Sequence, residues 1–397
     1  MAIRRQQLPL KRFGSIFPWV LLSFQDNSVN QEERVLSRIS LLRLIPVLAL
    51  TFATGNLSGS TITYEVGTCM PGLPRFPTIT AALAATPAAN VVKVCPGTYR
   101  EQVQITQPVT LEGVSTDDSA RAIIASPAGG LRIMATTDFG EPISPQLWVN
   151  NVSGPVNISD LTVDGSMSEI QFVVGVFYQN SSGTVNRVVS RNQSSGKAGG
   201  IAIWAEGGPS DPLVTIENSS VHDYADIGIE VETNSATPKL TAVIKGNELT
   251  TSKNAITVLA GIDILEGSSV TVTSKLLVDP GSAGILAEPF GSVGSISANT
   301  VVNGAKGIDT SSDGISVSSN KIFRSVTGIV LGTSIAAIQS NSITDSNVAI
   351  DFSCSANPNV HSNIITDAGT ALNRVPSAVA TSNKYFNVGT IRTGGCP

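Results

Sequence analysis

The residues best suited to chemistry lie in the middle third of the chain. Glu230 and Glu232 stand two residues apart in a segment where apolar and variable residues alternate. This alternation predicts a β-strand, and residues two apart on a strand share one face. Two neighbouring carboxyl groups can act as acid and base, or as acid and nucleophile, in cleaving a glycosidic bond. Glu230 and Glu232 are therefore the candidate catalytic residues.

Other side chains of similar segments are expected to face outward beside this pair. Aligning the segments places Trp204 and Gln179 in the same outward column as Glu232, and Asp309 in the column of Glu230. An aromatic ring beside carboxylates suits a sugar-binding groove. The predicted substrate-binding residues are Trp204, Gln179, His222 and Asp309. The two aligned columns are Phe177, Ala202, Glu230, Thr257, Leu286 and Asp309, and then Gln179, Trp204, Glu232, Leu259 and Glu288.

Plainer interpretations of these residues stay open. Outward carboxylates two residues apart are usually solvated surface groups. Residues 205–213 could simply cover Trp204, and His222 fits a turn as well as a site. Residues 115–150, which hold Trp148, are less repetitive, and we expect a long loop over one face there. Such loops often carry function.

A repeated six-residue unit must position these side chains. It consists of an apolar residue, two variable residues, Asn, one variable residue and a second apolar residue. Its asparagines recur about every 21 residues, and a small-apolar-variable-apolar unit follows each by about eight residues. Stacked asparagines can hydrogen-bond as a ladder, and Asn tolerates the left-handed backbone angles of turns. The predicted ladder residues are Asn247, Asn299, Asn320, Asn341, Asn363 and Asn383.

The repeat predicts a solenoid, because one coil cannot bury its own Ile and Val residues and a stack of coils can. We expect an all-β fold, a single-stranded right-handed parallel β-helix, with about ten coils over residues 156–385 at about 4.8 Å per coil. A leucine-rich repeat would need several Leu per unit, and a β-sandwich would not keep the asparagine period. Pro77, Ile79, Ala82 and Leu83 predict a short helix that caps the N-terminal end of the stack.

Residues 74–114 contain the most specific sequence motifs, including Phe76-Pro77-Thr78-Ile79 and Val94-Cys95-Pro96-Gly97-Thr98-Tyr99. This segment resembles the opening of pectin-lyase-like β-helix proteins, among them pectin methylesterases and bacterial exported β-helix repeat proteins. The resemblance implies the fold, not an activity. The catalytic motifs of pectin methylesterases, polygalacturonases, pectate lyases and alginate epimerases find no match in the chain.

The N-terminus is expected to direct export. Residues 35–60 have the order of a signal peptide, with Arg38 and Arg43 before the apolar run 44–53. This run is too short to span a bilayer as a helix, so no stable membrane span is expected after its removal. Residues 1–34 are either upstream of a true start near Val35 or a longer leader or signal anchor. Residues 61–397 form the predicted β-helix domain of a secreted, periplasmic or cell-surface protein.

The four cysteines agree with export, because disulfides persist in oxidising compartments. Four cysteines allow three pairings. We predict Cys69–Cys95 and Cys354–Cys396, one bridge near each end of the domain. The sequence contains no Cys-x-x-Cys and no nearby His, so no metal site is predicted, and no motif indicates a cofactor.

The amino-acid composition limits the kinds of molecule that the protein is expected to bind. Charged residues make up 14% of the chain and the net charge is −5, with no cluster of Lys and Arg after residue 45. This argues against nucleic acid. Two functions remain open: contact with an extracellular polysaccharide, as a lyase, hydrolase or binder, and a non-catalytic structural or adhesion module. Export and the Trp204 neighbourhood favour the first, and the missing catalytic motifs favour the second.

Overall fold

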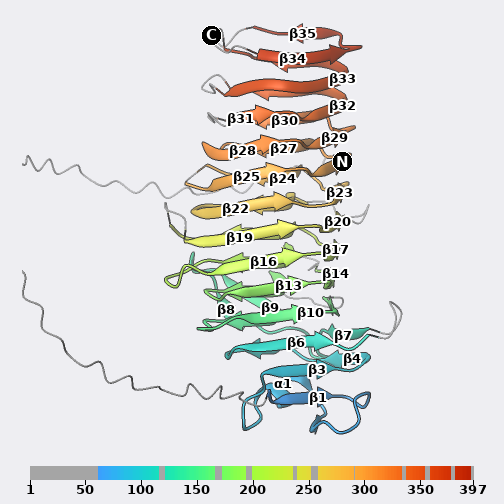
Figure 1. The fold of residues 1–397 in the computed structure, drawn as a ribbon, viewed down its shortest axis with the longest axis vertical. Helices are drawn as coiled ribbons and strands as arrows, with labels where there is room; N and C mark the ends of the chain where they lie inside the picture. Colours follow the sequence, from blue (N-terminus) through green and yellow to red (C-terminus); the bar gives the residue numbers. More distant parts are fainter. Residues whose placement is uncertain are drawn as a thin grey trace, which may run out of the picture. The chain divides into compact units, whose positions relative to one another are not determined.

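The computed structural model describes residues 61–115, 121–165, 172–193, 199–235, 239–251, 258–289, 291–332, 337–353, 358–376 and 381–394. In this part of the chain, 35 strands stack coil upon coil, with one short helix at the N-terminal end (Figure 1). The fold is therefore the predicted all-β parallel solenoid.

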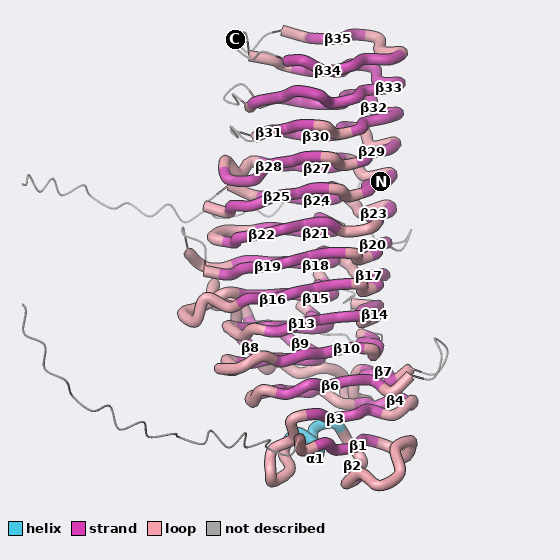
Figure 2. The backbone as a smooth tube through the Cα atoms, in the orientation of Figure 1, coloured by secondary structure: helices cyan, strands magenta, loops and turns pink. Residues whose placement is uncertain are grey.

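Each coil contributes strands to three faces, and the strands of one face pair in parallel with those of the coils before and after (Figure 2). Face 1 consists of β1 (Thr63–Val66), β3 (Val91–Val94), β6 (Val109–Gly113), β10 (Val156–Ser159), β13 (Gly183–Asn186), β16 (Leu213–Glu217), β19 (Leu240–Lys245), β22 (Ser268–Thr273), β25 (Val293–Ser297), β28 (Gly314–Ser318), β31 (Ala337–Gln339), the start of β33 (Asn359–Asn373) and β34 (Thr381–Phe386). The strand β2 (Arg75–Phe76) pairs with β1.

Face 2 follows each strand of face 1 after a turn. It consists of β4 (Gly97–Arg100), β7 (Ala122–Ala125), β11 (Leu161–Asp164), β14 (Val189–Arg191), β17 (Ser220–His222), β20 (Glu248–Thr250), β23 (Leu276–Val278), β26 (Thr300–Val302), β29 (Lys321–Phe323), the start of β32 (Ser342–Phe352), the middle of β33 and the end of β34.

Face 3 completes each coil and carries the candidate site. It consists of β5 (Val103–Ile105), β9 (Pro142–Asn150), β12 (Val173–Gln179), β15 (Gly200–Glu206), β18 (Ile227–Glu232), β21 (Ala260–Ile264), β24 (Ala283–Ala287), β27 (Lys306–Thr310), β30 (Thr327–Leu331), the ends of β32 and β33, and β35 (Thr390–Arg392). The strand β8 (Ala135–Thr136) is antiparallel to the start of β9.

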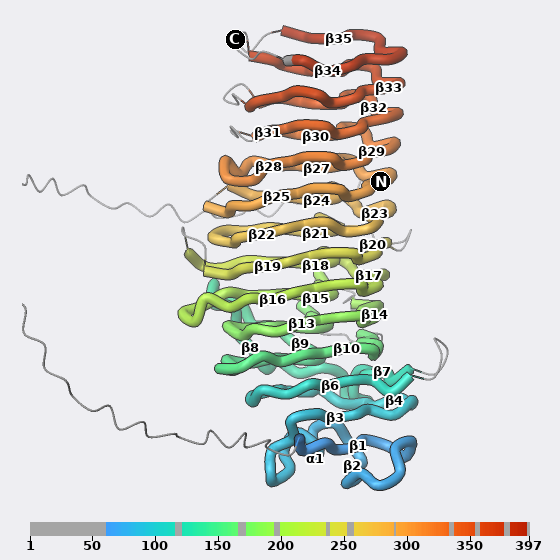
Figure 3. The backbone as a smooth tube through the Cα atoms, viewed as in Figure 1, coloured from blue at the N-terminus to red at the C-terminus, as the bar shows by residue number. Residues whose placement is uncertain are grey.

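Columns of branched apolar side chains fill the interior. Ile229, Ile262, Ile285, Ile308 and Ile329 follow one another in register on face 3, and all are fully buried. Each such side chain stabilises the fold by about 1.5–3 kcal/mol through burial. Because each coil packs only on its neighbours in sequence, the colours of Figure 3 change in order along the stack. The core is thus one continuous column of stacked layers.

The asparagine ladder is continuous in the C-terminal coils. The amide Nδ2 of Asn299 donates to Oδ1 of Asn320 at 2.8 Å, and the same bond joins Asn320 to Asn341, Asn341 to Asn363 and Asn363 to Asn383. Asn247 is also buried, but its Oδ1 accepts from the backbone N–H of Ser219. A serine therefore replaces the neighbouring amide there.

The left-handed backbone angles expected at these asparagines are not found there. A positive φ falls instead on the residue before four of these asparagines, at Ala298, Ser319, Ser340 and Ser362, with φ of 56–58°. The asparagine side chain instead points inward, where its Nδ2 also donates to a backbone carbonyl, as Asn341 does to Val317. The position requires Asn because its amide satisfies buried polar groups of two coils.

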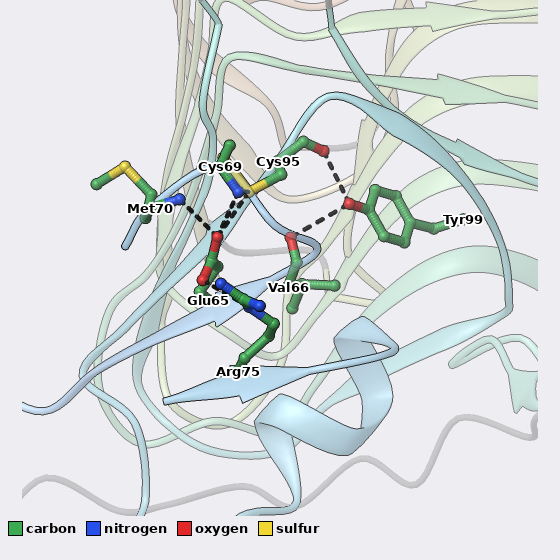
Figure 4. Close-up of a disulfide and its surroundings, with 7 residues drawn as sticks. All are labelled: Glu65, Val66, Cys69, Met70, Arg75, Cys95 and Tyr99. Atoms are coloured by element: carbon green, nitrogen blue, oxygen red, sulfur yellow. Dashed lines mark hydrogen bonds and ion pairs between the residues drawn. A yellow bond between two sulfur atoms is a disulfide. The ribbon is translucent and has the colours of Figure 1, made fainter. Parts of the chain in front are cut away.

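The N-terminal end is stabilised by a helix and a disulfide. Helix α1 (Ile79–Leu83) buries Ile79 and Ala82 and has Thr78 as its N-cap. The predicted Cys69–Cys95 bridge is formed (Figure 4). Beside it, the buried carboxylate of Glu65 accepts from the backbone N–H groups of Cys69 and Met70, and the Met70 bond in particular lowers the pKa of Glu65.

Several predictions fall outside the described residues. These are the leader segments 1–34 and 35–60, and the Cys354–Cys396 pair. Among the residues that the structure describes, no helix is long and apolar enough to cross a membrane.

Candidate functional site

The lateral order of side chains on face 3 differs from the predicted columns. Trp204 lies in register with Phe177 on one side and with Glu230 on the other. The residue in register with Glu232 is Glu206, not Trp204. Ala202 does not face outward at all, since it is buried in the inner core. The alignment of this strand was therefore wrong by two residues.

Small residues explain the error. Positions 175, 202 and 228 are in register and must be small, because a Cβ on Gly228 would lie 2.5 Å from the Gly261 carbonyl oxygen of the next coil. In the β15 segment both Gly200 and Ala202 are small, and the sequence analysis took Gly200 as the equivalent of Gly228. The corrected alignment keeps Trp204 on the outer side, turns Ala202 inward and changes the lateral neighbours of the strand.

An apolar cluster covers the outer side of face 3 before the carboxylates begin. Trp148, Phe177 and Trp204 follow one another in register, and the ring centroids of Phe177 and Trp204 are 5.2 Å apart. With Ala135, Ile143, Val174, Ile201 and Ile227 they form a second hydrophobic cluster. The exposed aromatic face predicted for Trp204 is corrected here, because only 4% of this residue is exposed.

The 126–141 loop, which includes β8, provides this cover. Its Ala135 packs into the cluster. Gln179 donates to the Thr136 carbonyl at 2.8 Å, and the backbone N–H of Asp138 donates to Glu206 at 2.6 Å. The expected long loop of residues 115–150 thus covers one face only over this shorter stretch, since β7 and β9 belong to the coils. Residues 205–213 were weighed for this role, and the 126–141 loop fills it.

Four acidic side chains continue the outer surface beyond Trp204. Glu230 is in register with Asp263 of the next coil, as Glu206 is with Glu232. Each of the four is at most 5% exposed. Glu230 Oε2, Glu232 Oε1 and Asp263 Oδ1 have no hydrogen-bond partner among the described residues. Buried, unpartnered carboxyl oxygens are costly, so this arrangement is unusual for a structural feature.

Burial is the main cause of raised pKa values in this cluster. It raises the pKa of Glu232 to about 8, with added repulsion from Glu206 and Asp263. Burial and then repulsion from Glu288 raise the pKa of Asp263 to about 8, and burial raises that of Glu206 to about 7. The pKa of Glu230 is raised well above its ordinary value, first by burial and then by Glu232 and Asp263. Groups with such values can hold or release a proton near neutral pH.

A pocket of about 350 Å³ opens beside these groups. Its described lining consists of Thr137, Phe139, Glu141, Phe172, Trp204, Glu230, Glu232, Leu265 and Glu266. Aromatic rings and carboxylates therefore meet at one cavity, although only the edge of the Trp204 cluster reaches it. A second pocket of about 430 Å³ is lined partly by Asp138 and Thr233.

The other predicted binding residues have different places. Gln179 reaches the cluster by donating to Glu206 Oε2 at 2.8 Å. His222 lies on face 2 in β17, where its Nδ1 contacts Asp223 at 2.7 Å, and it does not line the pocket. Asp309 lies further along face 3, in register with Leu286, and pairs with Lys306. The structure thus brings Gln179 to the site and leaves His222 and Asp309 outside it.

Glu206 and Asp263 were missed by the sequence analysis. Glu206 continues the alternation of β15 two residues beyond Trp204, a signal that the wrong alignment hid. Asp263 follows Gly261 and Ile262 in the pattern of Gly228-Ile229-Glu230, whereas the predicted column contained Thr257 in this coil. The pattern of a small, an apolar and an acidic residue occurs at Gly228-Ile229-Glu230 and again at Gly261-Ile262-Asp263. It could have identified the β18 and β21 coils together.

The described residues offer one grouping with the spacing of metal ligands, Glu65 with Cys69 and Cys95. The two sulfur atoms form the disulfide, so they are not available as thiolate ligands.

Comparison with known proteins agrees with this architecture. Residues 199–390 match the family model described as "Right handed beta helix region". Together with the parallel strands and stacked coils, this match shows that the chain has the right-handed parallel β-helix fold. The match covers the Glu230 and Asp263 coils and the whole asparagine ladder. None of the curated proteins compared with the chain by sequence matched it.

Solved structures with similar folds are distant in sequence. A catalytic domain of GH87 alpha-1,3-glucanase, the D1045A variant in complex with nigerose, has a TM-score of 0.50 and 11% identity over 85% of this chain and 66% of that chain. A GH136 lacto-N-biosidase from Eubacterium ramulus has a TM-score of 0.48 and 11% identity over 83% and 68%. The Azotobacter vinelandii mannuronan C-5 epimerase AlgE6 A-module has 0.42 and 13% over 80% and 93%. The chain spans 61–66% of the first three glucanase chains. At these identities the similarity shows the fold alone.

Proposed function

We propose that this protein is exported and contacts an extracellular polysaccharide at the pocket beside Trp204. The observation that carries the proposal is the meeting of Trp204, Glu230 and Glu232 at one cavity, where two carboxyl oxygens are buried without partners. A saccharide hydroxyl can donate to such oxygens, and an aromatic ring can pack against a sugar. The glucanase domain of similar fold was solved with nigerose, so a β-helix can accommodate a saccharide.

The acidic cluster also supports a more specific activity, the hydrolysis of a glycosidic bond. Glycosidases need one protonated and one ionised carboxyl group. Raised pKa values keep Glu232 protonated at neutral pH, which suits a general acid. Glu230, two residues before it on the same strand, would act as base or nucleophile in those molecules in which it is ionised.

The proposal is tested with a panel of acidic, neutral and amino glycans, measured for binding and for release of reducing ends. Wild-type protein is expected to bind at least one glycan. Glu230→Gln with Glu232→Gln should weaken binding by about tenfold, or about 1.4 kcal/mol. The matched control is Asp345→Asn with Asp367→Asn, which removes two exposed carboxylates at positive φ, where Asn is tolerated.

The outcomes separate the candidate functions. Cleavage that the Glu pair abolishes supports a hydrolase, and binding without cleavage supports a non-catalytic glycan binder. No binding by the wild type, or equal binding by both double variants, contradicts the site assignment. Surface localisation without glycan binding would support a structural or adhesion module instead.

Export is tested separately. The predicted signal peptide and the Cys69–Cys95 bridge support it, because that bridge persists in oxidising compartments. The mature N-terminus, determined by mass spectrometry of the extracellular and periplasmic fractions, is expected close to residue 60. Peptides from residues 1–34 in the cell would reject a start near Val35, and a purely cytoplasmic protein would reject export.

A further inference from the structure

The ionisable side chains that line the pocket among the described residues are all acidic. Its lining includes the carboxyl groups of Glu141, Glu230, Glu232 and Glu266, and none of its described lining residues is basic. Glu206 and Asp263 lie directly beside it, in register with Glu232 and Glu230. Whatever enters the pocket therefore meets Glu230 and Glu232 of β18 together with Glu141 and Glu266, and Glu206 and Asp263 lie beside the β18 pair.

Nothing in the described surroundings neutralises these groups. Two described basic side chains of neighbouring coils are paired elsewhere: Lys239 pairs with Asp211 at 3.2 Å, and Lys306 pairs with Asp309. Glu230 and Glu232 are each 5% exposed and keep one oxygen without a hydrogen-bond donor. A buried carboxylate without a donor is expensive, and a ligand that donates and carries positive charge would remove that cost.

We propose that the pocket takes a glycan with free amino groups, such as a polymer containing 2-amino-2-deoxy sugars. This inference rests on the proposed function and deepens it. An ammonium group has three donors and no acceptor, which matches oxygens that only accept when ionised. Its hydrogen bonds to carboxylates are charge-assisted and about twice as strong as neutral ones.

The same geometry disfavours acidic glycans. A uronate carboxylate would meet the carboxyl groups of Glu141, Glu230, Glu232 and Glu266. Each of these groups that is ionised repels it, and like charges across an interface cost several kcal/mol. Neutral glycans lack this repulsion but supply only neutral donors. The order of affinity expected from the lining is therefore amino above neutral above acidic.

Proton release gives the inference a specific signature. The pKa values of Glu206, Glu232 and Asp263 lie at about 7, 8 and 8, so near pH 7 Glu232 and Asp263 are largely protonated and Glu206 is about half protonated. An ammonium ion placed among them stabilises their ionised forms, so binding must release protons. Attraction to exposed carboxylates elsewhere on the protein would release none, since those are already ionised.

The experiment uses glycans matched in linkage: chitosan with chitin oligomers, and amino-dextran with dextran and carboxymethyl-dextran. Affinity and proton release are measured by calorimetry at pH 7 in two buffers of different ionisation enthalpy. The amino member is expected to bind about tenfold more tightly than its neutral partner, with protons released. Glu230→Gln with Glu232→Gln should remove both effects, and Asp345→Asn with Asp367→Asn should keep them.

Each outcome bears on a different statement. If a neutral or acidic glycan of the panel binds as tightly as the amino member, the inference fails and the proposed function stands. If amino-glycan binding persists in the Glu double variant, or releases no protons, it reflects the general acidity of the surface and the inference is overturned. Proton release by Ca²⁺ alone, without preference among the glycans, would assign the cluster to a metal ion and also overturn it. If no glycan binds at all, the proposed function itself fails.

Discussion

The carboxylates of face 3 in its middle coils differ from those of its C-terminal coils. Asp309 pairs with Lys306, and Asp351 further along the same column accepts two hydrogen bonds from Arg374. Glu230 and Asp263 occupy the same column in β18 and β21 but have no cation partner among the described residues. The fold can neutralise an acid at this position, so the unpaired acids of the middle coils are a property of the site.

The asparagine ladder in the interior also differs between the middle coils and the C-terminal coils. From Asn299 to Asn383 every turn contributes an amide to the ladder, whereas Ser219 and Ser274 interrupt it on either side of Asn247. The outer face of the middle coils carries a second apolar cluster and a covering loop. The regular coils are built for stability, and the irregular coils hold buried groups whose desolvation reduces it. The following predictions test this contrast.

The largest expected effect is in the ladder. Asn341→Ala removes the acceptor of Asn320 and the donor to Val317 and Asn363. Several buried polar groups lose their partners, so we expect the free energy of unfolding to fall by about 3–5 kcal/mol. Chemical denaturation measures it. The control Asn347→Ala, at an exposed position of β32, should change it by about 0.5 kcal/mol or less. Equal effects of the two variants would show that the ladder contributes nothing special.

An intermediate effect is expected from pH in the middle coils. Glu232 and Asp263 have folded-state pKa values of about 8, above the unfolded values of about 4. The folded protein therefore binds protons more tightly, and its stability is full below about pH 4 and falls as the pH rises to about 8. Denaturation curves at pH 5, 7 and 9 measure this. Glu232→Gln should flatten the decline and stabilise the protein at pH 9. A variant that declines as steeply as the wild type would contradict the raised pKa.

The smallest effect is expected when a C-terminal acid is made to resemble the middle ones. Lys306→Met leaves the largely buried Asp309 without its cation, so stability should fall by about 1–2 kcal/mol at pH 8. Lys321→Met, at an exposed position of β29, is the control, with a change of about 0.5 kcal/mol or less. No difference between the two variants would mean that the Lys306 pair does not distinguish the two regions.

The amino-acid sequence by itself determined the architecture. The asparagine period and the Ile and Val positions define a coil that cannot bury its own apolar face, and stacking is the one arrangement that buries it. The Cys69–Cys95 bridge and the helix at Ile79 could also be predicted from the sequence, because they depend on local spacing. The position of Glu230 and Glu232 on the outer side of one strand followed from alternation alone.

Only the tertiary structure decided which side chains meet across coils. Turns of unequal length and the two small residues Gly200 and Ala202 left the lateral alignment ambiguous, and a shift of two residues costs nothing in the alternating pattern. The carbonyl oxygen that approaches each small position resolves that ambiguity. It places Trp204 beside Glu230, brings in Glu206 and Asp263, and lets the 126–141 loop bury the tryptophan that the sequence had left exposed. The site depends on contacts between residues about 25–70 apart, which no local pattern specifies.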